Sequence, residues 1–456
     1  MSSATGLGLT TCGSKENPPG APGSRSPTPS PRMASTTHQP GEKSLYNMPR
    51  EIITYIFIEW TTLEWFAAAI ARQICSYFKA ITDSTPRVWS KLFLQCHLHA
   101  TAHDVRKWLG RAKEVPKEIY LRTEDIYVIM AALKSAKDAT SLIYRIPDLK
   151  GIRPHDEGLI RLPIHLPQLR HLHLDSSGIH PFHRARSNIF GLYNSSIDAH
   201  FPCLTILRLV CVDLTDFPIM PGLFPVMRHL DLHFPSGPTL DLIQVCRGSL
   251  EDLRVTAFFS HFSQFSRDGR ICLPNLKVLM VHASRGIVSN LEAPTLRLIY
   301  ANLDEMDGST RPFPSVVEWV TRQRPGHALD ITRHLNNMPQ LHHFALLQDI
   351  HTLKLCFEAL RDNPTLCPHL QSIEVVDFMN TSPAFRLDND FKKVLEGCVA
   401  QRAHKEPGFT LKFVGDHVQL NRYAQYHGGD VCSFMSIRYC LSYHVSRNTF
   451  APSKAH

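Results

Sequence analysis

The 456-residue sequence has few of the short motifs that mark an enzyme. It contains no GxSxG nucleophile elbow and no GxxxxGK[ST] phosphate loop, and Gly6-Leu7-Gly8 lacks the third glycine of a dinucleotide-binding turn. The 12 cysteines are scattered and include no CxxC pair, which is typical of reduced thiols rather than of a disulfide framework. We therefore expect a non-enzymatic protein that takes no cofactor.

Long apolar runs and blocks of one charge are also missing. No window approaches the ~20 apolar residues of a membrane span, and the opening MSSATGLGLTTCG has neither the basic head nor the apolar stretch of a secretory signal. The formal charge is +8, but no five basic residues adjoin, so no nucleic-acid-binding patch is indicated. These absences predict a cytoplasmic or nuclear protein that is not secreted and binds neither membrane nor nucleic acid.

One segment has the residue types of a metal site. It is Cys96-His97-Leu98-His99-Ala100-Thr101-Ala102-His103. On a helix, His99 and His103 would share a face, as zinc ligands can. The other ligands would have to be Cys96 and a distant residue, and no glutamate follows His99 to act as a base. Because 26 histidines produce close pairs by chance, we predict no metal site, and a metal-dependent enzyme stays a third hypothesis.

Residues 1–43 are rich in Pro, Gly, Ser and Thr and predict a disordered tail, because they cannot bury enough apolar surface to offset their ordering entropy. Within the tail, Ser26-Pro27-Thr28-Pro29-Ser30-Pro31 has the pattern that proline-directed kinases favour. The alternative is a solvated tail in which these dipeptides reflect composition alone.

The pattern after residue 44 predicts a small helical module. Pro49 suits a first helical turn, and four apolar residues at i, i+1, i+4 and i+5 form one stripe; they are Ile52, Ile53, Ile56 and Phe57. A second helix is expected over about residues 63–82, with Ile70, Ile74, Phe78 and Ile81 on one side. About fifty residues make a marginal core, and the wide stripes indicate apolar surface kept for a partner.

The order and spacing of these residues resemble an F-box. The matching stretches are Met48-Pro49-x-Glu51-Ile52-Ile53-x-x-Ile56-Phe57, Ile74-Cys75-x-x-Phe78-x-x-Ile81 and Ser84-Thr85-Pro86-Arg87-Val88-Trp89-Ser90-x-Leu92. Met48 replaces the usual leucine, and Tyr77-Phe78 stands where Arg-Trp is common. The resemblance implies docking on a Skp-type adaptor and, through it, on a cullin–RING ubiquitin ligase. The residues it implies in that interface are Met48, Pro49, Ile52, Ile53, Ile56, Phe57, Ile74, Cys75, Phe78, Pro86, Trp89 and Leu92. Trp89 belongs either to the interface or to the module's own core.

The rest of the chain repeats a phrase of the form Pro-x-Leu-x-x-Leu-x-Leu. Eight copies begin at Pro167, Pro202, Pro225, Ser249, Pro274, Pro294, Pro339 and Pro368. Each phrase fits a short strand, and intervening segments such as 328–337 and 357–363 read as helices. Since one such unit cannot bury its apolar face alone, the repetition predicts a stacked solenoid.

The pattern resembles leucine-rich repeats, although the usual Asn or Cys after the strand is replaced by Ser177, Val212 and Pro235. The predicted fold class is an α/β solenoid: a small all-helical F-box module followed by an irregular leucine-rich-repeat-like arc of short parallel strands and helices. The expected divisions are residues 1–43 as tail, 44–95 as F-box module, 96–165 as linking irregular repeats, 166–415 as solenoid and 416–456 as C-terminal cap or tail. An F-box joined to degenerate repeats resembles the large F-box families of fungi.

Strand alternation also predicts a target-binding face. If Leu172 and Leu174 point into the core, the residues between and beside them point outward on the concave side. The residues predicted for target binding are His171, His173, Asp175, Arg208, His229, Asp231, His233, Arg254, Met280, His282 and Tyr300. The same rule places Ile206, Val210, Asp252, Thr256 and Asn302 outward; the alternative is ordinary solvated strand surface.

Together these patterns predict a substrate-recognition subunit of a Skp–cullin–F-box type ubiquitin ligase. Its partners would be a Skp-type adaptor and an unknown target protein, and it would act by raising the effective concentration of the target near the ubiquitin-charged enzyme. The alternative is a repeat scaffold for protein–protein interaction without a link to ubiquitin.

Overall fold

The computed structural model describes residues 48–64, 66–95, 100–146, 166–177, 201–214, 219, 221–257, 270–282, 286–306, 312–322, 331–347, 350–376, 389–405 and 409–414. The chain divides into two compact units, Met1–Pro49 and Arg50–His456, and the description below concerns the second unit except where Met48 or Pro49 is named. The predicted tails (residues 1–43 and 416–456) and residues 96–99 lie outside the described residues.

Thirteen of the described strands form one sheet in which every pairing is parallel and the strands follow chain order. They are β1 (Lys91–Gln95), β2 (Lys117–Arg122), β3 (Ala139–Arg145), β4 (His171–Asp175), β5 (Ile206–Val210), β6 (His229–His233), β7 (Asp252–Thr256), β9 (Val278–His282), β11 (Leu298–Tyr300), β12 (Glu318–Arg322), β13 (His343–Leu347), β14 (Ser372–Val376) and β15 (Thr410–Val414). A separate parallel pair joins β8 (Ile271–Cys272) to β10 (Leu291–Glu292). Strict chain order in a parallel sheet is the arrangement of a solenoid.

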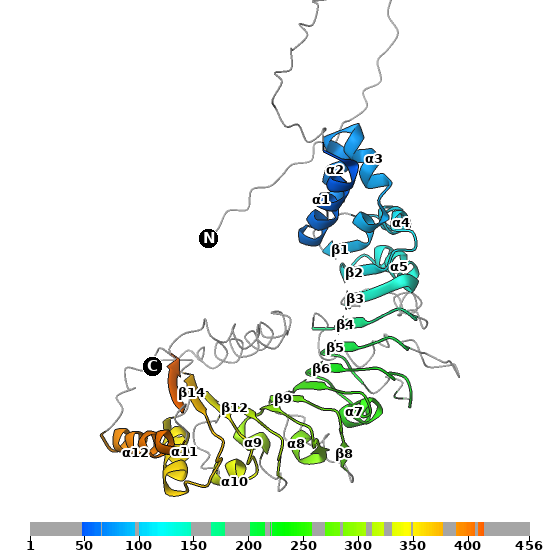
Figure 1. Ribbon diagram of the computed structural model, residues 1–456. Helices are drawn as coiled ribbons and strands as arrows, with labels where there is room; N and C mark the ends of the chain where they lie inside the picture. The colour runs from blue at the N-terminus through cyan, green and yellow to red at the C-terminus, as the bar shows by residue number, and fades with distance from the viewer. Residues whose placement is uncertain are drawn as a thin grey trace, which may run out of the picture. The chain divides into compact units, whose positions relative to one another are not determined.

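Helices precede the sheet and connect its strands (Figure 1). The first three are α1 (Arg50–Leu63), α2 (Ala67–Ile74) and α3 (Ser76–Asp83), followed by the 3₁₀ turn η2 (Pro86–Trp89). The connecting helices are α4 (Ala102–Arg111), α5 (Ile126–Lys134), η3 (Ala136–Asp138), α7 (Thr239–Cys246), α8 (Ile287–Asn290), α9 (Leu303–Met306), α10 (Ile331–Asn336), α11 (Ile350–Asp362) and α12 (Asn389–Lys405). The predicted fold class, a small helical module followed by an α/β solenoid, is confirmed. No described helix is long and apolar enough to cross a membrane.

Leucine alternation builds the core, as the sequence predicts. Leu172 and Leu174 are buried on β4, and they pair in register with Leu207 and Leu209 of β5. The same positions on the later strands join one continuous cluster that runs from Leu92 to Cys398. Stacking therefore buries the apolar side of the described strands in one core, which includes residues of helices such as α5 and α7.

All eight copies of the repeated phrase form strands, and a ninth copy was missed. It reads Pro314-x-Val316-x-x-Trp319-x-Thr321 and forms β12, with Val316 and Trp319 buried where the other copies have leucine. This copy divides the long interval between the phrases at Pro294 and Pro339 into two intervals of the usual repeat length. A search for leucine alone could not find it, because valine and tryptophan fill these positions.

Small polar residues connect four successive repeats through three hydrogen bonds. They occupy the second position of the phrase, where Asn275 donates to the carbonyl oxygen of Gly248 at 2.8 Å, Thr295 to that of Pro274 at 2.7 Å and Ser315 to that of Pro294 at 2.7 Å. Each bond satisfies a backbone carbonyl of the preceding repeat. This ladder lies before the strand, whereas the asparagine position of leucine-rich repeats lies after it.

The predicted helix over residues 63–82 is two helices. The chain breaks at Cys75, whose backbone is extended (φ −161°, ψ 167°), and the Cys75 thiol accepts the Phe78 N–H at 3.4 Å to cap α3. The break changes which side chains share a face. Ile70 and Ile74 on α2 are exposed, whereas Phe78 and Ile81 on α3 are buried, so the expectation of one common side was wrong.

Candidate functional site

Helix α1 has an apolar stripe on each of two sides. Ile53 and Phe57 point into the core of the helical module, and Phe57 meets the ring of Phe78 edge to face at 5.2 Å. The other stripe is exposed and includes Ile52 and Ile56, whose surfaces are 49% and 41% accessible. An exposed stripe on a helix that already has a packed one is apolar surface left for contact with something else.

Helix α2 continues this arrangement. Its alanines Ala68 and Ala71 are fully buried and let α2 approach α1 closely, while Ile70 and Ile74 face solvent. The large apolar side chains exposed on α1, α2 and the turn between them are Ile52, Tyr55, Ile56, Leu63, Phe66, Ile70 and Ile74. We call this set the exposed apolar surface of the helical module.

The structure divides the twelve residues that the F-box resemblance assigns to an adaptor interface. Met48, Pro49, Ile52, Ile56 and Ile74 are exposed, and Cys75 and Pro86 are half-buried. Ile53, Phe57, Phe78, Trp89 and Leu92 are buried. A partner could not reach the last five in this conformation, because they fill the module's core or, for Leu92, the core of the sheet. Tyr55, Leu63, Phe66 and Ile70 are exposed apolar residues that the interface prediction did not include.

Trp89 joins the helical module to the sheet. It is 1% exposed, its indole N–H donates to the carbonyl oxygen of Thr82 at 2.8 Å, and its ring meets that of Trp108 at 4.8 Å. Trp108 lies on α4 and donates in turn to the carbonyl oxygen of Lys91 at 2.9 Å, at the start of the first strand. Of the two roles left open for Trp89, the structure shows that of a core residue.

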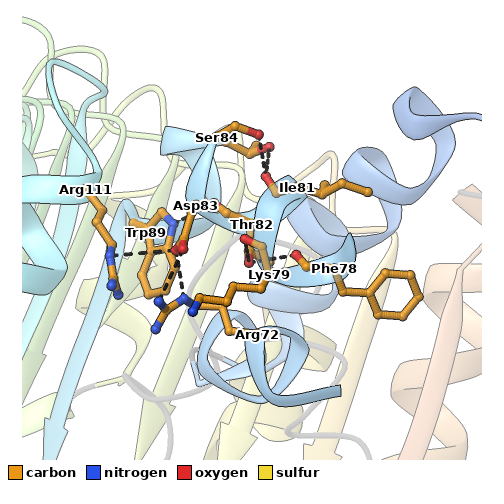
Figure 2. Close-up of polar contacts among 10 residues, drawn as sticks. Arg72, Phe78, Lys79, Ile81, Thr82, Asp83, Ser84, Trp89 and Arg111 are labelled. Carbon is orange, nitrogen blue, oxygen red and sulfur yellow. Dashed lines mark hydrogen bonds and ion pairs between the residues drawn. The ribbon is translucent and has the colours of Figure 1, made fainter. Parts of the chain in front are cut away.

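Two arginines and an aspartate enclose this joint (Figure 2). Asp83 at the end of α3 lies 2.7 Å from Arg72 Nε on α2 and 3.9 Å from Arg111 Nε on α4. Burial and the nearby Arg72 guanidinium lower the pKa of Arg111, while Asp83 raises it. One carboxylate thus connects α2, α3 and α4 beside Trp89.

The predicted target-binding residues share the side of the sheet opposite the leucine core, which we call the open face. The strand register aligns His173, Arg208, Asp231, Arg254 and Met280 on consecutive strands, and Tyr300 follows on β11. Parallel rows beside it contain His171 and His229 on one side, and Asp175, His233 and His282 on the other.

Asp231 is the centre of a buried polar cluster on this face. Its carboxylate lies 3.3 Å from Arg208 Nε and 2.8 Å from His233 Nε2. Burial raises the pKa of Asp231, but His233 and Arg208, together with Arg254, lower it more, so the net pKa is below the ordinary value. The Asp231 carboxylate is therefore charged at neutral pH.

A second cluster adjoins it on the next strand. Arg254 donates from Nε and Nη2 to the two carboxylate oxygens of Asp252, at 3.1 and 2.8 Å, and His229 Nδ1 lies 3.5 Å away. Burial raises the pKa of Asp252, and the hydrogen bonds from His229 and Arg254 lower it below its usual range. Two-pronged Arg–carboxylate pairs are geometrically specific, so the charges of Arg254 and Asp252 are paired with each other.

The prediction of outward-facing residues needs two corrections. Asp231, His233, Asp252 and Thr256 lie on the open face but are buried, because in-register neighbours cover them. Asn302 is also buried, and it lies beyond β11, where its backbone N–H and side-chain amide donate to the Glu305 carboxylate at 2.7 and 3.1 Å.

A cavity of about 20 Å³, enough for one water molecule, opens between β6 and β11. Its lining includes Asp231, His233, Arg254, Met280, His282 and Tyr300. Among the residues that the structure describes, no three His, Cys, Asp or Glu side chains could hold a metal ion. Cys96, His97 and His99 of the metal candidate lie outside those residues, and His103 is exposed on α4.

No protein-family model matches the chain, and a search of curated proteins finds no match.

Proposed function

We propose that the chain is a substrate-recruiting subunit of a ubiquitin ligase of the Skp–cullin–F-box type. The helical module would dock on a Skp-type adaptor, and the open face of the sheet would bind a target protein. The observation that carries the proposal is the exposed apolar surface of the helical module. Seven large apolar side chains are exposed on the two helices α1 and α2 and the turn between them, and a concentration of exposed apolar surface of this kind marks an interaction site.

The sequence supports the choice of partner. The exposed residues Ile52, Ile56 and Ile74 fall at positions where the F-box resemblance expects adaptor contacts, and Met48 and Pro49 just before α1 are exposed as well. Hydrophobic residues at helical spacing are suited to a groove or helix surface on another protein. Ubiquitin transfer would be carried out by other subunits, and this chain would contribute proximity.

Contacts at Trp89 join the module to the repeats. Trp89 and Trp108 pack edge to face, and Asp83 holds arginines of α2 and α4. A recruiting subunit gains effective concentration from such a connection, because a stiff link restricts the positions that a bound target can take. The chemistry expected of the chain is therefore binding and orientation.

The test is co-purification of the full chain with a Skp-type adaptor. Ile56→Asp and Ile74→Asp should each reduce adaptor capture by at least about tenfold, because a charge would be buried in an apolar interface. Leu355→Asp is the matched control, since Leu355 on α11 is 42% exposed and Ile56 is 41% exposed.

The alternative function is a repeat scaffold with no link to ubiquitin. The exposed polar residues beside the buried clusters around Asp231 and Asp252, such as His171 and His229, would suit a protein-binding surface in either case. If the wild-type chain captures no Skp-type adaptor, the ligase proposal is wrong and the scaffold remains. If Ile56→Asp binds the adaptor as the wild type does, the exposed apolar surface is not the docking site.

A further inference from the structure

The open face of the first three strands has an apolar row that the target-binding prediction did not include. Phe93, Tyr120 and Ile143 lie in register on β1, β2 and β3, and all three are half-buried. The rings of Phe93 and Tyr120 stack with centroids 4.1 Å apart and planes 14° apart. The row continues to His173 on β4, where the residues predicted for target binding begin. These strands lie next to the helical module (Figure 1).

Two arginines lie two residues beyond this row along their strands. Arg122 is two residues beyond Tyr120 and Arg145 is two residues beyond Ile143, so both belong to the open face. The register Leu121↔Tyr144 puts the two arginines opposite each other at the ends of β2 and β3. Arg122 is exposed and Arg145 is half-buried. Like charges in this relation repel each other.

Neither arginine has an ion pair with another described residue. Asp175 lies opposite Arg145 in register, but its Oδ1 accepts the Ser177 N–H at 2.8 Å and the carboxylate forms no ion pair with Arg145. On the other side of the apolar row, Lys91 pairs with Glu118 at 3.3 Å. The two guanidiniums are therefore the cations on these strands that an incoming anion could bridge, which would also relieve their repulsion.

We propose that the open face of β1–β3 binds an extended peptide segment of the target that has an anionic side chain two residues from a large apolar side chain. The spacing follows from the strands. Side chains at i and i+2 of an extended peptide are about 6.8 Å apart on one face, the same spacing that separates Tyr120 from Arg122. The apolar side chain would lie on the Phe93–Tyr120 stack and the anion between Arg122 and Arg145.

The anion is a carboxylate or a phosphate, because the planar guanidinium fork binds either in two-pronged geometry. This inference rests on the proposed function, because it takes the open face as the side that binds the target. It adds the chemistry of the target segment. It also moves part of that surface to strands near the adaptor-docking helices. Sequence reasoning assigned β2 and β3 to a linking region and β1 to the end of the F-box module.

The test uses the full chain and short fluorescent peptides in a Gly-Ser background, with binding followed by anisotropy. The peptides contain Phe-Gly-Glu, Phe-Gly-phosphoserine, Phe-Gly-Gln or Gly-Gly-Glu. Both anionic phenylalanine peptides should bind at least about tenfold more tightly than the other two, and added salt should weaken them. Equal binding of the two anionic peptides identifies a carboxylate as sufficient, and tighter phosphoserine binding identifies phosphate.

The double variant Arg122→Gln/Arg145→Gln should lose this preference, whereas Arg228→Gln should keep it. Arg228 is the matched control because its side chain is 62% exposed and it precedes β6 rather than lying on β1–β3. Equal binding of the neutral Phe-Gly-Gln peptide, or an unchanged preference in the double variant, would overturn the proposal.

Adaptor capture by the double variant is measured in parallel and should be unchanged, because Ile56 and Ile74 lie on α1 and α2. A variant that keeps the adaptor and loses the anionic peptides supports the inference. If the wild type captures no adaptor but still prefers the anionic peptides, the ligase function fails and the peptide surface stands.

Discussion

The guanidinium carbon of Arg111 lies 4.4 Å from the centre of the Trp89 ring, on which Arg72 also packs at 5.8 Å. Because Arg111 ends α4 and Arg72 lies on α2, a buried tryptophan of the module is held by cations from both sides of the joint. Cation–π contacts of this kind are strongest where water is excluded, and Trp89 is almost completely buried.

Trp89→Phe should loosen the helical module. The variant removes the indole N–H that donates to the Thr82 carbonyl oxygen, and it removes part of the ring that meets Trp108. Together these losses should lower the free energy of unfolding by about 1–3 kcal/mol. Hydrogen exchange should accelerate in α2 and α3 more than in β5–β7. Trp60→Phe is the comparison, because the Trp60 indole donates to Glu64 at an exposed site and its half-buried ring packs only at the edge of the module's core, so its cost should be clearly smaller than that of Trp89→Phe. Equal costs for the two variants would contradict the assignment of Trp89 to the joint.

The ladder between repeats predicts a separate loss of stability. Thr295→Val and Ser315→Ala each remove a hydrogen bond to the preceding repeat, and each should cost about 0.5–1.5 kcal/mol in urea unfolding. The two bonds share no partner, so the double variant should equal the sum of the single ones to within about 0.5 kcal/mol. Val226→Ala serves as the control. Val226 occupies the same position in the phrase at Pro225 but is apolar, so this variant measures the cost of shortening a side chain there without the loss of a hydrogen bond. If the ladder does not stabilise the fold, Thr295→Val should lower the free energy of unfolding no more than that control does.

Much of the fold could be predicted because leucines at fixed spacing specify both the strand and its buried side. The phrase at Pro167 predicts β4 and the inward direction of Leu172 and Leu174, and the structure shows both. The same logic fails at β12, where Val316 and Trp319 provide equivalent burial with different residues. It also fails for β1–β3, whose sequences do not contain the phrase.

The candidate sites were harder to predict because they depend on register and on a single backbone break. The extended backbone at Cys75 ends α2 and changes the direction of the chain. Helical periodicity that is continued through Cys75 therefore assigns the wrong face of α2 to the core. The burial of Asp231 follows from its position between strands that contain Arg208 and Arg254, which are far apart in sequence. Strand alternation identifies the outward side but not the depth of a residue on it.

Buried and exposed apolar residues of the helical module should respond in opposite ways to substitution. Phe78→Ala should lower the unfolding free energy by about 3–5 kcal/mol, because Phe78 fills the module's core beside Phe57. Ile74→Ser should change stability by no more than about 0.5 kcal/mol, because Ile74 is exposed. Thermal unfolding and adaptor capture measured on both variants separate folding from docking. A large loss of stability in Ile74→Ser would show that this side chain has a structural role.

His173 predicts how stability depends on pH. Burial, and secondarily the Arg208 guanidinium, lowers the pKa of His173 to about 4, against the opposing effects of Asp175 and Asp231. The unfolded chain has a histidine pKa of about 6.5, so between these values it binds more protons than the folded chain and stability falls as the pH falls. From pH 7 to pH 5 the loss due to this one group is about 2 kcal/mol.

Urea unfolding at pH 7, 6 and 5 checks the prediction. His173→Gln should remove about that 2 kcal/mol of pH dependence, while His103→Gln, a change at an exposed histidine of α4, should leave it intact. Asp231 and Asp252 do not contribute in this window. Their pKa values are lowered by folding, so the stability they provide is complete above about pH 5 and is lost only in more acidic solution. An unchanged pH dependence in His173→Gln would mean that the imidazole is hydrated in the folded chain and that the centre of the open face is open to water.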